Sequence, residues 1–108
     1  MLKGWKIVLF AATFVAFCGT GLFAAEHEVG QKNKAFTVEA LKIKAGDTVS
    51  FPNFDTFYHN VYSLSPVKIF DLGSYAKGQT QKVKFEKAGK VTVQCAIHPE
   101  MKMTIDVQ

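Results

Sequence analysis

The chain has 108 residues, 48% of them hydrophobic and 20% charged, which is enough for one domain at most. All 13 basic residues are Lys and give a net charge of +4 at pH 7 against nine acids. These lysines do not cluster on a face with interleaved aromatic residues, so the sequence argues against nucleic acid as a partner.

The first 25 residues have the composition of an export signal. Lys3 and Lys6 lie in a charged start, an unbroken apolar run follows, and small residues precede a polar stretch. This order is typical of a secretory signal peptide. We therefore predict a signal peptide over residues 1–25, with cleavage after Ala24 or Ala25, and a periplasmic or otherwise exported protein.

Cleavage would leave a domain over residues 26–108 with 11 Lys against nine acids, a net charge of +2. It would also remove Cys18, so that Cys95 would be the only thiol. Exported domains normally use cysteines in pairs, and a lone cysteine is either buried and inert or has a chemical role. We expect a monomer without stable membrane insertion; the alternative is an uncleaved anchor over residues 7–25, which is long enough to span a bilayer.

The segment after the signal predicts an all-β domain. Short stretches with alternating polar and apolar residues, separated by turn residues, are typical of half-buried strands in a small sandwich. The strand candidates are residues 36–38, 41–43, 48–51, 60–64, 80–85, 91–95 and 104–107. Residues 65–78 are poorly periodic and contain Pro66, Gly73 and Gly78, which predicts a crossing connection with room for a helical turn.

The strongest alternation predicts a hairpin of residues 80–85 and 91–95, joined by a turn over residues 86–90. One face of this hairpin is apolar and should point into the core. Its inward residues are Val83, Phe85, Val91, Val93 and Cys95. Cys95 would then end a strand, so that the residues after it lie in a loop at one pole of the sandwich.

That loop contains the main functional signal. Cys95, His98 and Met101 place a thiol, an imidazole and a thioether within seven residues. A thiolate, two imidazoles and a weak axial thioether form the donor set of a type 1 copper site. The second imidazole would come from His59, because His27 lies near the predicted N-terminus and is expected to be a solvated tail residue.

These residues resemble a known family. The motif His59-Asn60-Val61 followed by Cys95-x-x-His98-Pro99-x-Met101 is similar to that of the cupredoxins, the small blue copper proteins, and most of all to the plastocyanin and amicyanin branch. Residues 41–49 and 85–89 resemble turns of the same branch, so the resemblance covers nearly the whole mature chain.

The resemblance implies an eight-stranded, cupredoxin-like Greek-key β-sandwich and copper as the cofactor. It implies His59, Cys95 and His98 as the strong ligands, with Met101 as the axial ligand and Met103 as the alternative. Asn60 would tie the two ligand loops together, and His98 would be the partly exposed ligand through which electrons pass.

The expected function is that of an exported mononuclear type 1 copper protein that carries single electrons between redox partners, such as a cytochrome or a dehydrogenase. The alternative is a periplasmic copper-binding or copper-delivery protein that uses the same ligands for affinity. No substrate pocket or second set of metal ligands is evident in the sequence, so we do not expect an enzyme. Phe54, Phe57 and Tyr58 could form an apolar docking face, although aromatic residues in such loops more often serve packing.

Overall fold

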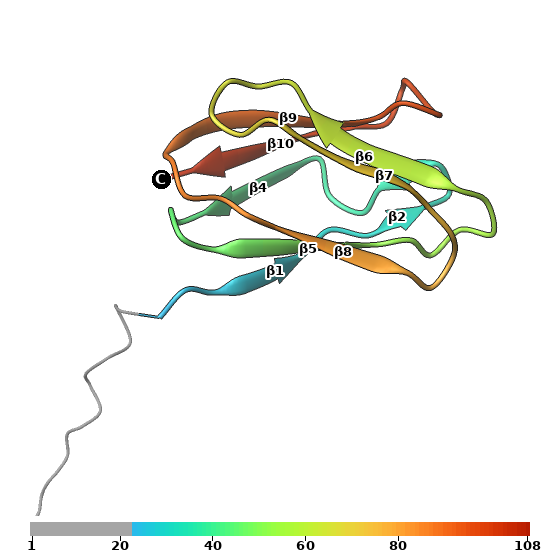
Figure 1. The fold of residues 1–108 in the computed structure, drawn as a ribbon, viewed down its shortest axis with the longest axis horizontal. Helices are drawn as coiled ribbons and strands as arrows, with labels where there is room; N and C mark the ends of the chain where they lie inside the picture. Colours follow the sequence, from blue (N-terminus) through green and yellow to red (C-terminus); the bar gives the residue numbers. More distant parts are fainter. Residues whose placement is uncertain (1–22) are drawn as a thin grey trace, which may run out of the picture.

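Residues 23–108, the part of the chain that this computed structural model describes, fold into ten strands without a helix (Figure 1). The strands are β1 (Glu26–Glu28), β2 (Gln31–Lys32), β3 (Ala35–Phe36), β4 (Ala40–Ile43), β5 (Thr48–Pro52), β6 (His59–Ser63), β7 (Phe70–Tyr75), β8 (Thr80–Lys84), β9 (Gly89–Cys95) and β10 (Lys102–Val107). Within the described residues, no helix could cross a membrane. The predicted signal peptide falls almost wholly on residues 1–22, which lie outside the described part, so its cleavage stays a prediction.

Two sheets form the sandwich. One has the strand order β1-β5-β8 and the other the order β4-β10-β9-β6-β7, while β2 and β3 make a small separate ladder. The pairs β1–β5 and β4–β10 are parallel, and the remaining strand pairs are antiparallel. The predicted all-β sandwich is therefore confirmed.

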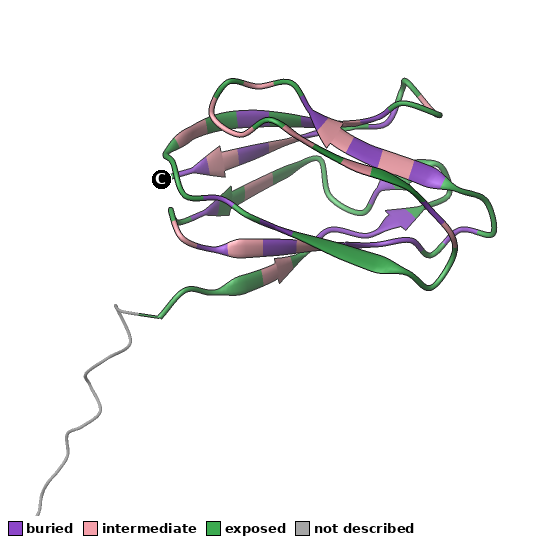
Figure 2. Ribbon diagram, in the orientation of Figure 1, coloured by how far each residue is buried: buried purple, intermediate pink, exposed green. Residues whose placement is uncertain are grey.

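The core lies between the two sheets, where buried and more exposed residues alternate along the strands (Figure 2). Burial of apolar surface is the main driving force for such a fold. All residues predicted to face inward from the two alternating segments are buried: Val83, Phe85, Val91, Val93 and Cys95.

The predicted hairpin between residues 80–85 and 91–95 is wrong. β8 pairs with β5 in the smaller sheet, whereas β9 pairs with β10 and β6 in the larger one. The chain crosses between the sheets at residues 85–88, where the Phe85 amide donates to the Asp47 carbonyl. Alternation tells which side chains face the core, but both sheets share that core, so alternation cannot tell which strand is the neighbour.

The connection over residues 65–78 also differs from the prediction, since it contains β7 and no helical turn. β7 is an edge strand that pairs only with β6, with a register shift between Asn60 and Tyr62. Only Tyr75 among its residues is fully buried. An exposed and irregular edge strand has little hydrophobic periodicity, which is why its sequence pattern was weak.

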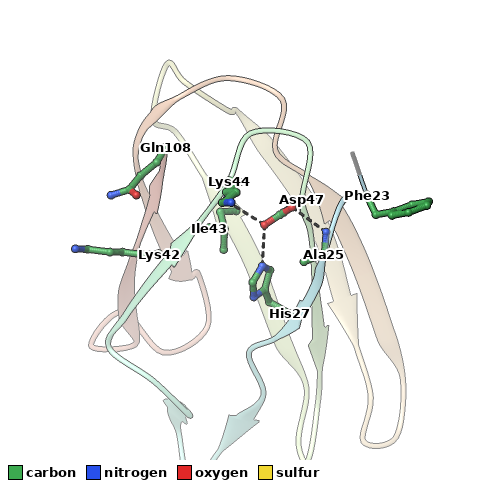
Figure 3. Close-up of a pocket in the computed structure, with 8 residues that line it drawn as sticks. All are labelled: Phe23, Ala25, His27, Lys42, Ile43, Lys44, Asp47 and Gln108. Carbon is green, nitrogen blue, oxygen red and sulfur yellow. Dashed lines mark hydrogen bonds and ion pairs between the residues drawn. The ribbon is translucent and has the colours of Figure 1, made fainter. Parts of the chain in front are cut away.

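The prediction that His27 is a solvated tail residue is wrong. His27 lies in β1, and its Nε2 is 2.9 Å from Oδ2 of the buried Asp47 (Figure 3). The Asp47 carboxylate also accepts hydrogen bonds from the backbone amides of Ala25 and Lys44. Asp47 therefore fastens β1 to the turn between β4 and β5, at the end of the sandwich opposite to the start of β6 (Figure 1).

This arrangement predicts how stability depends on pH. The hydrogen bond from His27, followed by those from Lys44 and Ala25, lowers the pKa of Asp47 from 3.8 to about 2. A carboxyl whose pKa is lower in the folded protein stabilises the fold above its unfolded pKa, and this contribution disappears as the pH falls through 3.8 towards 2. We expect Asp47→Asn to lower the melting temperature at neutral pH and to weaken the stability loss between pH 4 and pH 2.

Thermal unfolding of the copper-free protein and its Asp47→Asn variant over this pH range measures the effect. Melting curves of the two proteins that shift in parallel with pH would contradict the assignment of this acid sensitivity to Asp47.

Candidate metal centre

The pairing of β6 with β9 brings the first two predicted ligands together. β6 begins at His59 and β9 ends at Cys95, and the antiparallel register places Val61 opposite Cys95. Side chains two residues apart on a strand point to the same face, so His59 is directed to the same side as Val61. Both His59 and Cys95 are fully buried.

His98 completes a cluster with these two residues. The Cys95 Sγ atom lies 3.7 Å from His59 Nδ1 and 3.9 Å from His98 Nδ1. All three donor atoms lie within 4.8 Å of one another, and no other group of three His, Cys, Asp or Glu in residues 23–108 could hold a metal ion. Bonds of about 2.0–2.3 Å to a first-row metal in a trigonal plane separate the donors by roughly 3.5–4 Å. The cluster therefore fits a metal ion bound by one thiolate and two imidazoles.

The loop after β9 holds His98 by short backbone contacts. The Met101 amide donates to the His98 carbonyl at 2.9 Å, and the Cys95 amide donates to the Met101 carbonyl at 3.3 Å. His98 is half-buried in this loop, as the resemblance implied for the partly exposed histidine. The backbone thus forms a tight turn that presents His98 beside the thiol.

The two methionines occupy different places, although both are buried. Met101 lies in the loop that contains His98, directly after the turn. Met103 lies within β10, opposite Val93, and alternates with Ile105 as a core residue of that strand. This placement favours Met101 over Met103 as the axial donor, which stays a prediction.

Asn60 links the two ligand segments through its backbone rather than its side chain. Its amide donates to Cys95 Sγ at 3.4 Å, and its carbonyl accepts from the Ala96 amide at 3.3 Å. The side-chain amide instead donates to Asp71 on β7. The resemblance implied that Asn60 ties the two loops together. In the structure the backbone amide and carbonyl of Asn60 make this link, and any residue except proline has both groups.

Asp55 is a polar neighbour of the cluster that the sequence analysis did not identify. Its Oδ2 lies 2.7 Å from His59 Nε2, the ring nitrogen that faces away from Cys95. Burial alone would raise the pKa of Asp55, but hydrogen bonds from His59 and from the Asn33 and Lys34 amides outweigh burial and hold the pKa below its usual value. A carboxylate in an irregular loop has no fixed spacing to a histidine, so no sequence pattern could reveal this contact.

Aromatic and apolar side chains surround the imidazoles. The Phe57 ring lies 5.3 Å, between ring centroids, from both the His59 ring and the His98 ring. Tyr58 and Ile97, from the two ligand loops, are 58% and 46% exposed. The cluster therefore lies under a partly apolar surface at one pole of the sandwich, with His98 nearest to solvent among the three.

A small β-sandwich with one cysteine and two histidines at its pole defines the class of mononuclear copper-binding β proteins. Comparison with known families agrees with this. Residues 24–108 match the family of copper binding proteins described as the plastocyanin/azurin family. The chain belongs to this family, and copper is its cofactor.

Individual proteins support the same relationship. The chain is 33% identical over 85 residues to the methylamine utilization protein MauL of Methylorubrum extorquens, covering 78% of this chain and 75% of that protein. The solved structure of amicyanin from Paracoccus versutus matches with a TM-score of 0.69 and 27% identity, covering 75% of this chain and 79% of the other.

A copper-containing nitrite reductase from Thermus scotoductus matches equally well in fold, with a TM-score of 0.70 and 27% identity. The match covers 75% of this chain but only 22% of the reductase chain. The similarity therefore concerns only about a fifth of a much longer chain.

The role of Asn60 can be tested by removing its side chain. Asn60→Ala leaves both backbone hydrogen bonds to the Cys95 segment in place and removes one exposed bond to Asp71, so we expect a loss of at most about 1 kcal/mol in the free energy of unfolding. The visible spectrum of the copper-loaded variant should match that of the unchanged protein. A large loss of the copper-thiolate absorption would show that the side chain itself holds the site.

Proposed function

We propose that this protein is an exported one-electron carrier whose copper ion is bound by His59, Cys95 and His98, with Met101 as a weak axial donor. The observation that carries the proposal is the convergence of one thiol sulfur with two imidazole Nδ1 atoms at 3.7 and 3.9 Å. Copper held by such donors can cycle between Cu(I) and Cu(II) with little rearrangement.

The surroundings of the site support electron transfer. Cys95 and His59 are fully buried, and Val93, two residues before Cys95 on the inward face of β9, is buried as well. A hydrophobic shell limits the access of water and tunes the reduction potential of a metal. The positions of the proposed ligands follow from strand pairing and from a short turn closed by backbone hydrogen bonds.

The surface of the site supports a protein partner. His98 is the half-buried member of the cluster, and exposed Tyr58 and Ile97 lie on the same two loops. Electrons would enter or leave through His98 while a partner covers these apolar side chains. The partner would be another redox protein, such as a dehydrogenase or a cytochrome, and the similarity to a methylamine utilization protein is compatible with a dehydrogenase.

We further propose that the protein works outside the cytoplasm as a monomer and is not itself an enzyme. The signal-like residues 1–25 support export. The match to the nitrite reductase does not argue for catalysis, since this chain corresponds to 22% of that enzyme chain.

A visible spectrum after addition of Cu(II) tests the proposed function. The unchanged protein should show an intense thiolate-to-copper band that a reductant bleaches and an oxidant restores. Cys95→Ser replaces the thiolate by a hydroxyl of similar size and should abolish the band. Because the thiol is fully buried, far-UV circular dichroism must show that the variant is folded.

Other results would overturn the proposal. A colourless protein that binds copper tightly would favour copper delivery or storage. A protein that binds no copper would leave Cys95 as a core residue.

A matched pair of substitutions tests the axial donor. Met101→Leu removes a weak thioether donor that favours Cu(II), so we expect a higher reduction potential. Met103→Leu changes an equally buried methionine on β10 and should leave the potential unchanged. Each exchange conserves volume and should cost less than about 1.5 kcal/mol of stability. Spectroelectrochemical titration of both variants measures their reduction potentials. A shift in potential confined to Met103→Leu would make Met103 the axial donor in place of Met101.

A further inference from the structure

The carboxylate of Asp55 is held more firmly than its position in a loop would suggest. Its Oδ1 accepts the Asn33 amide at 2.8 Å, and its Oδ2 accepts the Lys34 amide at 3.2 Å as well as the His59 ring nitrogen at 2.7 Å. Its own amide donates to the side-chain oxygen of the buried Asn53. Only 8% of the Asp55 side chain is exposed.

Two parts of the fold supply these contacts. Asn33 and Lys34 form the two-residue turn between β2 and β3, and both have positive φ angles, 56° and 58°. A tight hairpin turn with two left-handed residues directs both amides to one side, although Lys rarely adopts this conformation. Asn53 is fixed in turn, because its side-chain amide donates to the carbonyls of Phe57 and Tyr75.

The contact to His59 determines which ring nitrogen carries the proton. Asp55 already accepts two amide hydrogens, and an ionised carboxylate can only accept, so the proton between the two side chains lies on Nε2. The Nδ1 atom then keeps its lone pair, and this is the atom 3.7 Å from the Cys95 sulfur. His98 differs, because within the described residues its ring contacts Cys95 Sγ through Nδ1 and its Nε2 forms no hydrogen bond.

We propose that Asp55 is a positioning residue of the copper centre, which fixes the tautomer of His59 and, through its negative charge, favours Cu(II) over Cu(I). This rests on the proposed copper site. A carboxylate behind a ligating histidine raises the basicity of the ring, and loss of such partners typically weakens metal binding by about 10–100-fold. The higher charge of Cu(II) makes its binding more sensitive to a nearby anion than that of Cu(I).

Asp55→Asn, which removes the charge at nearly constant shape, tests the proposal. We expect Cu(II) affinity to fall by at least about tenfold more than Cu(I) affinity, which corresponds to a rise in reduction potential of about 59 mV for one electron. The intense thiolate band should remain, since Cys95 and both histidines are unchanged.

Asp47→Asn is a matched control. Asp47 also accepts a histidine Nε2 and two backbone amides, but at the opposite end of the sandwich (Figures 1 and 3). The same exchange there should lower stability and leave the reduction potential unchanged. An unchanged potential in Asp55→Asn, or equal shifts in both variants, would overturn the proposal.

A measurement on the unchanged, copper-free protein covers the case in which Asp55→Asn does not fold. Nitrogen-15 NMR of the histidine rings should show the proton of His59 on Nε2 and a bare Nδ1. A proton on Nδ1 would overturn the proposal. The two ideas can fail separately: a missing thiolate band in the unchanged protein defeats the proposed function, whereas a normal band with an unchanged potential in Asp55→Asn defeats only the role of Asp55.

Discussion

The pairing of β6 with β9 is the constraint on which the proposed copper site depends. It places Val61 opposite Cys95 and lets the Asn60 amide donate to the Cys95 sulfur. A shift of one residue in this register would turn His59 away from the thiol, because side chains alternate between the two faces of a strand. The buried residues of both strands resist such a shift, so the hydrophobic core fixes the distance between the first two proposed ligands.

Once this register is set, the remaining parts of the site need only local structure. The turn after β9 is closed by two backbone hydrogen bonds between Cys95, His98 and Met101, and it carries the third donor. Because these hydrogen bonds restrict the loop, ordering it would reduce the free energy of metal binding only slightly. A metal that binds to the folded state alone stabilises the fold by mass action.

The sequence predicted the parts that depend on periodicity and on residue chemistry. The inward face ending at Cys95 and the choice of His59 as the distant histidine both follow from such patterns, and the structure brings these residues together. The strand pairing of β8 and the strand β7 were not predicted, because two sheets share one core and an edge strand has little periodicity. Asp55 was also missed, since its contact to His59 depends on how two loops and the β2–β3 turn meet in space.

The two histidines of the site are supported in opposite ways, and this asymmetry suits an electron carrier. His59 is fully buried, and its Nε2 is hydrogen-bonded to Asp55. His98 is half-buried, and its Nε2 has no hydrogen-bond partner among the described residues. In the proposed site, a fixed histidine and a buried thiolate would maintain the geometry that copper needs in both oxidation states, so little reorganisation would accompany electron transfer. The exposed edge of His98 would approach the proposed partner without disturbing this geometry. The loop that exposes His98 also brings Ile97 to the surface, so contact with the proposed partner and access to the metal would occur at one place.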